Sequence, residues 1–187
     1  GSIYSCGNII KWLRDKMKFF ENSEDSEDFR RKDGNSNNVL FLPAFNGLGA
    51  PYWNSEIRGG FYGITQDTSI EDMTTAAFQS VAFQTKDITN ILSLYDIKIQ
   101  KLLVDGGMVS NKTFCQVLAD TLQIEIVKPK NVESTAIGAC KVAMLSSGMS
   151  IENLSKNEIT YKVNKDRRDV YFRNYSKWQE YLLNTIK

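Results

Sequence analysis

The fold of this chain is decided by one short stretch, Leu102-Leu103-Val104-Asp105-Gly106-Gly107-Met108-Val109-Ser110-Asn111. Its apolar start is typical of a strand, and its Asp-Gly-Gly end comes directly before helical sequence from Lys112. Glycines there let the backbone approach a ligand closely, the helix start supplies free amides, and Asn111 offers both a donor and an acceptor. The stretch predicts a ligand site at a strand end, although a Gly-Gly turn can also be a simple connection.

The sequence after this stretch continues the strand and helix rhythm. Its periodicity predicts a strand over 101–105, a helix over 112–122, a strand over 125–128 ended by Pro129, and a helix over 131–147 closed by Gly148. Helically spaced aromatic residues in 161–187 predict a closing helix on the outside of the sheet. This alternation indicates an α/β layer architecture in one domain of 187 residues.

The sequence before this stretch predicts further elements. They are an amphipathic helix over 3–20, a polar surface segment over 22–38, a strand over 39–43, a glycine-rich loop over 44–54, and a strand or turn over 59–64. Ser69 and Asp72 form a capping box. It should start a helix over about 70–94 whose expected buried residues are Met73, Ala77, Val81, Ile88 and Ile91.

The composition excludes several classes of partner and chemistry. Lysine and arginine total 23 against 22 acidic residues, so we expect neither nucleic acid nor a membrane surface as a partner. The chain has no histidine, which removes Ser-His and Cys-His catalysis. Three widely spaced cysteines, Cys6, Cys115 and Cys140, are expected to be reduced, buried thiols. With no membrane-spanning run or signal peptide in view, we expect a cytoplasmic location.

Two stretches of this sequence resemble a known enzyme family. Residues 45–53 are similar to the Phe-Thr-Gly-Leu-Gly-Ala-Pro-Tyr-Trp stretch of glycerol kinases, with Asn46 as a departure. Residues 59–79 resemble the second signature of the FGGY carbohydrate kinases, whose required residues are all present: Phe61, Gly63, Ile64, Asp72, Met73, Ala76 and Gln79. The similarity also covers 6–15, 84–85, 104–107 and 133–139, so it extends to about Gly148.

The resemblance implies an actin/hexokinase-like (ribonuclease H-like) nucleotide-binding domain over 1–187, the carboxy-terminal half of a two-domain kinase and incomplete at its start. It implies ATP-dependent phosphorylation of glycerol to sn-glycerol 3-phosphate, with ATP or ADP and Mg²⁺ as cofactors. It also implies an amino-terminal domain as partner and a homo-dimer or tetramer at full length. The catalytic base and the glycerol contacts are expected upstream of residue 1, so we assign no catalytic or metal-binding residue and expect the chain alone to be inactive.

Four residues match nucleotide-binding positions of that family. By resemblance, Gly107 and Asn111 hold the adenosine part, while Gly7 and Lys11 line the phosphate side. Lys11 replaces the glutamine of some members, and a solvent-facing lysine is the open alternative there. Two other functions stay open for the chain: a truncated, non-catalytic module that binds a nucleotide or a subunit, and a scaffold whose glycines are purely structural.

Overall fold

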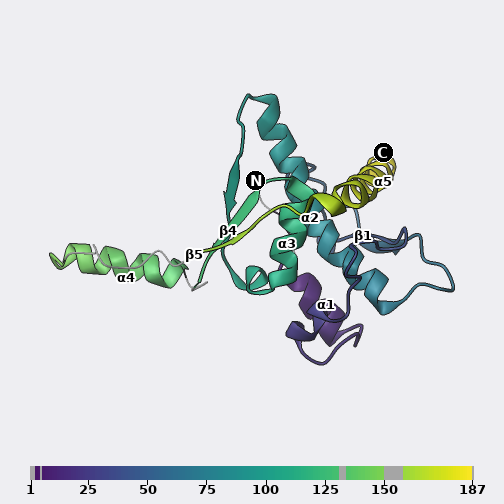
Figure 1. The fold of residues 1–187 in the computed structure, drawn as a ribbon, viewed down its shortest axis with the longest axis horizontal. Helices are drawn as coiled ribbons and strands as arrows, with labels where there is room; N and C mark the ends of the chain where they lie inside the picture. Colours follow the sequence, from purple (N-terminus) through teal and green to yellow (C-terminus); the bar gives the residue numbers. More distant parts are fainter. Residues whose placement is uncertain (1–2, 5, 131–133, 150–157, 187) are drawn as a thin grey trace.

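The computed structural model describes residues 3–4, 6–130, 134–149 and 158–186 (Figure 1). Its helices are α1 (Asn8–Asp15), α2 (Ile70–Leu94), α3 (Lys112–Leu122), α4 (Ser134–Ser146) and α5 (Arg168–Ile186). Its strands are β1 (Leu40–Leu42), β2 (Gly60–Tyr62), β3 (Lys101–Leu103), β4 (Glu125–Pro129) and β5 (Glu158–Tyr161). Three short 3₁₀ turns, η1 (Ser23–Glu27), η2 (Gly107–Ser110) and η3 (Lys165–Arg167), join them.

The strands form two small sheets. β3 and β4 are parallel and are joined through η2 and α3, which is the strand-turn-helix-strand unit predicted from residues 102–128. β5 adds antiparallel to the other edge of β4, pairing Ile126 with Tyr161. β1 and β2 pair antiparallel as a separate two-stranded sheet. The sheet order β3-β4-β5 leaves one edge of β3 without a partner in the described part of the chain.

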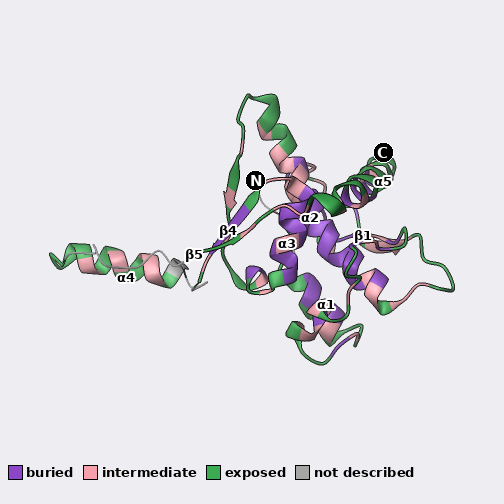
Figure 2. Cartoon of the chain, viewed as in Figure 1, coloured by how far each residue is buried: buried purple, intermediate pink, exposed green. Residues whose placement is uncertain are grey.

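The long helix α2 is the centre of the molecule, and its middle is buried (Figure 2). It packs against α3 on one side and β1 on another, while α5 contacts both β1 and α3. Phe41 and Phe61 stack with ring centroids 4.3 Å apart between the paired strands. The buried Trp178 of α5 donates its indole N–H to the carbonyl of Phe41 at 2.9 Å, which ties the closing helix to β1.

The start of α2 confirms the capping box. The Ser69 side chain accepts from the Asp72 N–H, and Asp72 accepts from the Ser69 N–H. Asp72 is fully buried and also accepts from Arg31 at 2.7 Å and Asn37 at 2.9 Å. Burial alone would raise the pKa of Asp72, but the hydrogen bonds from Arg31 and Ser69 outweigh it and leave the pKa below its ordinary value.

Segment 22–38 is mostly at the surface, but some of its residues are buried and hydrogen-bonded to α2. Arg31 reaches Asp72 as described, and Gln79 of α2 donates to the carbonyl of Gly34 at 2.6 Å. Ser26, Gly34 and Ser36 are buried. The polar composition of this segment therefore reflects buried hydrogen bonds as well as exposure.

Several predictions of extent or burial were wrong, among them those for the first helix, the end of α2 and the first strand of the three-stranded sheet. The first helix covers only Asn8–Asp15 rather than 3–20, because the chain turns at Lys16 and adopts φ +58° at Lys18. Ile91 is 38% exposed rather than buried, because the end of α2 projects from the rest of the molecule (Figure 1). The strand predicted over 101–105 ends at Leu103.

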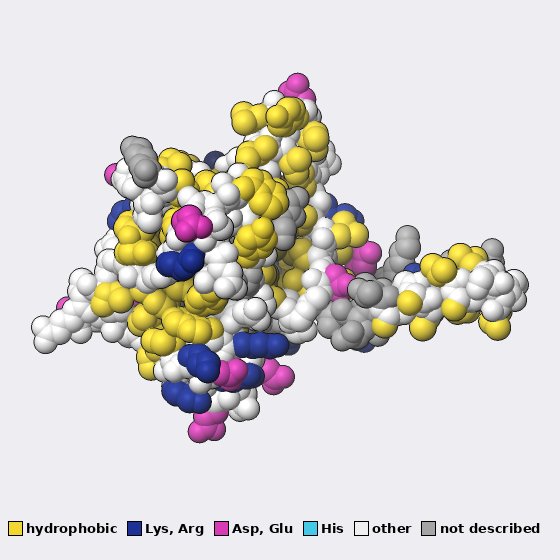
Figure 3. All heavy atoms as spheres, turned by 180° about the vertical axis from the view of Figure 1, so that it is seen from behind, with side chains coloured by type: hydrophobic (Ala, Val, Ile, Leu, Met, Phe, Trp, Pro, Cys, Tyr) yellow, Lys and Arg dark blue, Asp and Glu magenta, His cyan; other side chains and the backbone are white. Residues whose placement is uncertain are grey.

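Helix α4 lies away from the rest of the molecule in Figure 1, and Figure 3 shows hydrophobic side chains along it. Residues 131–133 of the helix predicted over 131–147 lie outside the described residues, and the observed helix is Ser134–Ser146. Val142 and Leu145 are exposed on it. Cys140 is exposed too, so the prediction of a buried thiol there was wrong, whereas Cys115 is buried and Cys6 is half-buried.

The three tryptophans have different surroundings. Trp12 of α1 packs near Phe41 and Phe45, and Trp178 is buried. Trp53, at the end of the glycine-rich loop, is 65% exposed.

Among the described helices, none combines the length and hydrophobicity that crossing a bilayer requires.

Candidate functional site

A pocket of about 720 Å³ lies between α1, η1 and η2. It brings together all four predicted nucleotide-binding residues, although Gly7 and Lys11 lie about a hundred positions before Gly107 and Asn111 in the sequence. The other lining residues are Asn8, Ile10, Ser23, Glu24, Glu27, Met108, Ser110 and Lys112. The predicted residues therefore share one site.

Glycines keep two walls of this pocket open. Gly106 has φ +100°, a conformation that favours glycine, and it turns the chain from the end of β3 into η2. A Cβ atom added to Gly107 or Gly7 would meet nothing within 4 Å, and neither residue has a positive φ. At these two positions glycine leaves room rather than relieving backbone strain, so a bound molecule could contact the backbone directly.

Asn111 does not have the free side chain that the sequence suggested. Its Oδ1 accepts from the Phe114 N–H at 2.9 Å and caps α3, and its Nδ2 donates to Ser26 Oγ at 3.2 Å. Helix capping therefore already uses part of the acceptor capacity of Oδ1. The second hydrogen on Nδ2 and the second lone pair of Oδ1 are what the side chain can still offer a ligand.

The start of α3 likewise offers fewer free amides than expected. The Lys112 N–H donates to Glu27 Oε1 at 2.8 Å, and the Phe114 N–H is capped by Asn111. A carboxylate of this chain thus occupies the place at the helix start where an anionic ligand group could bind. The phosphates of a ligand would have to bind elsewhere in the pocket.

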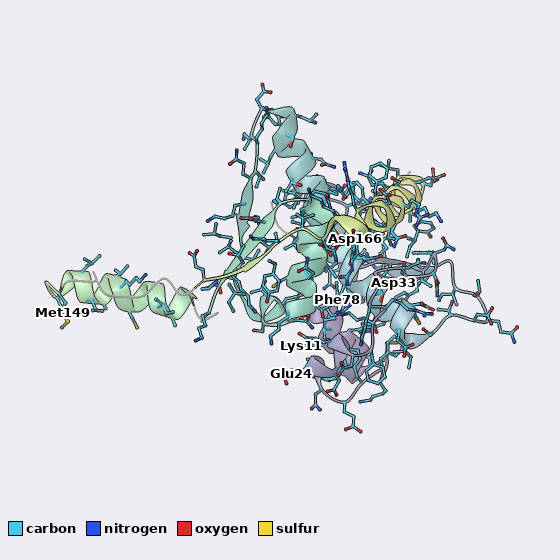
Figure 4. All side chains as sticks on the ribbon, viewed as in Figure 1. Lys11, Glu24, Asp33, Phe78, Met149 and Asp166 are labelled. Atoms are coloured by element: carbon cyan, nitrogen blue, oxygen red, sulfur yellow. The ribbon has the colours of Figure 1, made fainter. Side chains whose placement is uncertain are left out.

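Charges of both signs line the pocket. Lys11 and Lys112 supply ammonium groups, while Glu24 and Glu27 supply carboxylates. Figure 4 labels Lys11 and Glu24, which lie near each other at the α1 end of the molecule. Ile10 and Met108 add apolar walls. This arrangement suits a ligand that has both an apolar part and an anionic part, the latter close to Lys11.

Cys6 lies next to the pocket and contacts it through sulfur. Its Sγ is 3.5 Å from the Sδ of Met108, a lining residue. Burial raises the pKa of the Cys6 thiol to about 11, so the thiol stays protonated at neutral pH. Cys6 therefore packs beside the site and is a poor nucleophile.

The sequence did not identify the residues that η1 contributes to the pocket. Ser23, Glu24 and Glu27 lie in the polar segment 22–38, whose composition is typical of a solvated surface. No local signal distinguishes Glu27 from its acidic neighbours, because its partner Lys112 is 85 positions away. Asp105, at the end of the stretch that opens the strand-turn-helix unit, is exposed and does not line the pocket.

The glycine-rich loop over 44–54 also does not line the pocket. Leu48 and Asn54 exchange backbone hydrogen bonds of 2.7 and 3.0 Å across it. The Tyr52 hydroxyl donates to the buried Asp87 of α2 at 2.7 Å. In the described structure, the most specific motif of the sequence shapes a loop and anchors it on α2.

Residues 1–147 match the FGGY family of carbohydrate kinases, C-terminal domain. A glycerol kinase from Streptococcus pneumoniae (strain Hungary19A-6) is 39% identical over 185 residues, covering 95% of this chain and 37% of that protein. The structure of Plasmodium falciparum glycerol kinase with ADP matches 100% of this chain and 38% of its own, with a TM-score of 0.84 and 29% identity.

A ligand-bound xylulose kinase from Lactobacillus acidophilus has the same fold, with a TM-score of 0.80 over 95% of this chain at 22% identity. These similarities confirm the predicted actin/hexokinase-like α/β fold class. The chain spans 37% to 38% of the length of the glycerol kinases that it matches.

Proposed function

Because the chain belongs to the FGGY family of carbohydrate kinases, as its C-terminal domain, we propose that it is the ATP- and ADP-binding part of a glycerol kinase. The observation that carries this proposal is the convergence of Gly7, Lys11, Gly107 and Asn111 on one pocket. The 39% identity to a glycerol kinase and the match to a glycerol kinase structure with ADP support it.

In this proposal the nucleotide lies with its adenosine against Gly107 and Asn111, which both line the pocket, and the glycine leaves the backbone there open. Lys11 faces the phosphates, since the α3 amides of Lys112 and Phe114 already have partners. The role of this chain is to hold and orient ATP, which accounts for a large part of catalysis in phosphoryl transfer.

The acceptor is glycerol, and the product is sn-glycerol 3-phosphate. The base and the glycerol contacts come from the part of the relatives that this chain does not cover, so the chain alone transfers no phosphoryl group. Among the described residues there is no group of three or more acidic, cysteine or histidine side chains that could hold a metal. We therefore assign no residue of this chain to Mg²⁺ and no step to that ion.

Calorimetric titration with ADP tests the pocket. Gly107→Leu should fill it without backbone strain and weaken ADP binding by at least about tenfold, or about 1.4 kcal/mol. Gly7→Leu should act in the same direction from the opposite wall.

Gly138→Leu is the matched control, because a Cβ there also meets nothing within 4 Å and α4 lies away from the pocket. A folded wild-type chain that does not bind ADP, or Gly107→Leu and Gly7→Leu chains that bind it normally, would refute the proposed site.

The acceptor needs a second experiment on the polypeptide that carries this chain together with the remainder found in its relatives. Transfer from ATP should be faster to glycerol than to xylulose or gluconate. A preference for xylulose or gluconate would contradict the assignment to glycerol while leaving the kinase family intact. The chain alone should give no product with any acceptor.

A further inference from the structure

Lys128 of β4 is a buried lysine directly behind the pocket wall. Only 6% of it is exposed. Its Nζ donates to the carbonyl of Val109 at 2.7 Å and lies 3.5 Å from that of Ser110. The ring centroid of Tyr161 is 5.9 Å away. Within the described residues, this ammonium group forms no ion pair with a carboxylate at 4.0 Å or less. The ion pairs there are formed by Arg14, Arg31 and Arg167 instead.

A lysine at this position is costly for a purely structural residue. Its neighbours Ile126 and Val127 are apolar and buried, so the strand could hold an apolar side chain here as well. Removing an ammonium group from water without a counter-ion is unfavourable unless polar groups compensate. Here the carbonyl groups of η2 compensate for the lost hydration of the Lys128 ammonium group.

The carbonyls that Lys128 holds belong to the turn that forms the pocket wall. Gly107, Met108 and Ser110 of η2 line the pocket, and Asn111 follows them. A single 3₁₀ turn is a weak structure by itself. Besides the hydrogen bonds of the turn itself, the Val109 carbonyl accepts from Lys128 and from the thiol of Cys115, which donates at 3.3 Å. The ammonium group is the stronger donor of these two.

We propose that Lys128 is a positioning residue for the nucleotide pocket: its ammonium group fixes η2 through the Val109 and Ser110 carbonyls, so that Gly107 and Asn111 keep their ligand-binding positions. This inference rests on the proposed function. A buried cation is also poorly screened by solvent, so Lys128 adds positive potential behind a pocket in which Glu24 and Glu27 oppose an anion.

Three substitutions of Lys128 separate the contribution of its hydrogen bonds to η2 from the contribution of its positive charge. Lys128→Met removes the charge and all donors, Lys128→Gln keeps a donor without the charge, and Lys128→Arg keeps both. Lys130→Met is the matched control, because Lys130 follows on the same segment but is exposed. ADP affinity is measured by calorimetry, and the thermal unfolding midpoint is measured separately, so that binding is compared at a temperature where each variant is folded.

We expect Lys128→Met to weaken ADP binding by about tenfold in the folded chain, Lys128→Arg to restore it, and Lys130→Met to leave it unchanged. If Lys128→Met does not fold, Lys128→Gln decides, and weakened binding by folded Lys128→Gln supports the inference. A lower unfolding midpoint with normal ADP affinity overturns it, since that is the result of a merely structural role. If wild type itself binds no ADP, the proposed function fails and this inference fails with it.

Discussion

Asn111 links the ligand pocket to the start of α3 through its side chain. Its acceptor caps the helix, and its donor reaches Ser26 in η1. Two walls of the pocket are therefore joined by one residue. A substitution here changes stability as well as binding, so a loss of nucleotide affinity in Asn111→Ala alone would not assign a ligand contact.

We predict that Asn111→Ala lowers the free energy of unfolding by about 1 kcal/mol or more, because the cap is lost. Asn111→Asp keeps an acceptor for the Phe114 N–H and places a negative charge at a helix start, so it should be destabilised less. Urea unfolding of the three chains measures both effects. Equal destabilisation by the two substitutions would show that the cap is not the main contribution of Asn111.

At the scale of single residues, the sequence predicted the four residues that share the pocket, but it did not predict their hydrogen bonds. The family resemblance identified Gly7, Lys11, Gly107 and Asn111, and the structure places all four on one pocket. The hydrogen bonds that Lys112 donates to Glu27 and Asn111 donates to Ser26 each join residues 85 positions apart. Such pairs depend on tertiary packing, and no local pattern encodes them.

Among the elements, α2 is held to its neighbours through Asp87. This buried carboxylate accepts from Tyr52 of the glycine-rich loop at 2.7 Å, and from Tyr175 and Gln179 of α5 at 2.5 and 2.9 Å. Burial raises the pKa of Asp87, and the hydrogen bonds from Tyr175, Tyr52 and Gln179 only partly oppose that effect.

This pKa gives a pH-dependent prediction. Because the folded pKa of Asp87 lies above the unfolded value of about 3.9, the native state binds the proton more tightly. The stability that this group contributes is therefore fully present below the unfolded pKa, and it is lost as the pH rises through the folded pKa. Asp87→Asn removes this titration. The free energy of unfolding of the Asp87→Asn chain, relative to that of wild type, should therefore increase as the pH rises from about 3 to about 7.

Urea unfolding of wild type and Asp87→Asn at several pH values measures this difference, since each unit of pKa shift corresponds to about 1.4 kcal/mol. Tyr52→Phe serves as a control that keeps the carboxylate but removes one donor. If the difference in unfolding free energy between Asp87→Asn and wild type stays constant over this pH range, the prediction is contradicted.

The elements that the sequence predicted well are those with strong local signals. The bounds of α2 and α3 agree with the prediction because a capping residue starts each and the apolar period is regular. α1 was predicted too long because Met17 and Phe20 continue its spacing while the chain has already turned at Lys16. β5 was not predicted, since its four residues form a strand only by pairing with β4.

For the molecule as a whole, an open sheet edge and exposed apolar side chains occur together. β3 has a free edge in the described structure, and its Leu103 is 66% exposed. Leu94, Tyr95 and Ile97, at and just after the end of α2, are also exposed. Unpaired edges of this kind pair with other chains.

We predict that the isolated chain self-associates at micromolar concentrations and that Leu103→Lys reduces the association, because a charged edge strand resists pairing. Leu183→Lys, which replaces a 54% exposed leucine on α5, is the matched control and should have little effect. Sedimentation velocity over a range of concentrations measures the outcome. A monomeric wild-type chain, or equal effects of the two substitutions, would contradict this role of the β3 edge.

The unequal burial of the three tryptophans has a spectroscopic consequence. Trp178 is enclosed and Trp12 is packed among phenylalanines, whereas Trp53 is 65% exposed. The intrinsic fluorescence of the folded chain should therefore contain a red-shifted component that iodide quenches and a bluer component that iodide does not reach. A Trp53→Phe chain would lose the quenchable component, and the remaining emission would then report on the interior around α1, β1 and α5 alone.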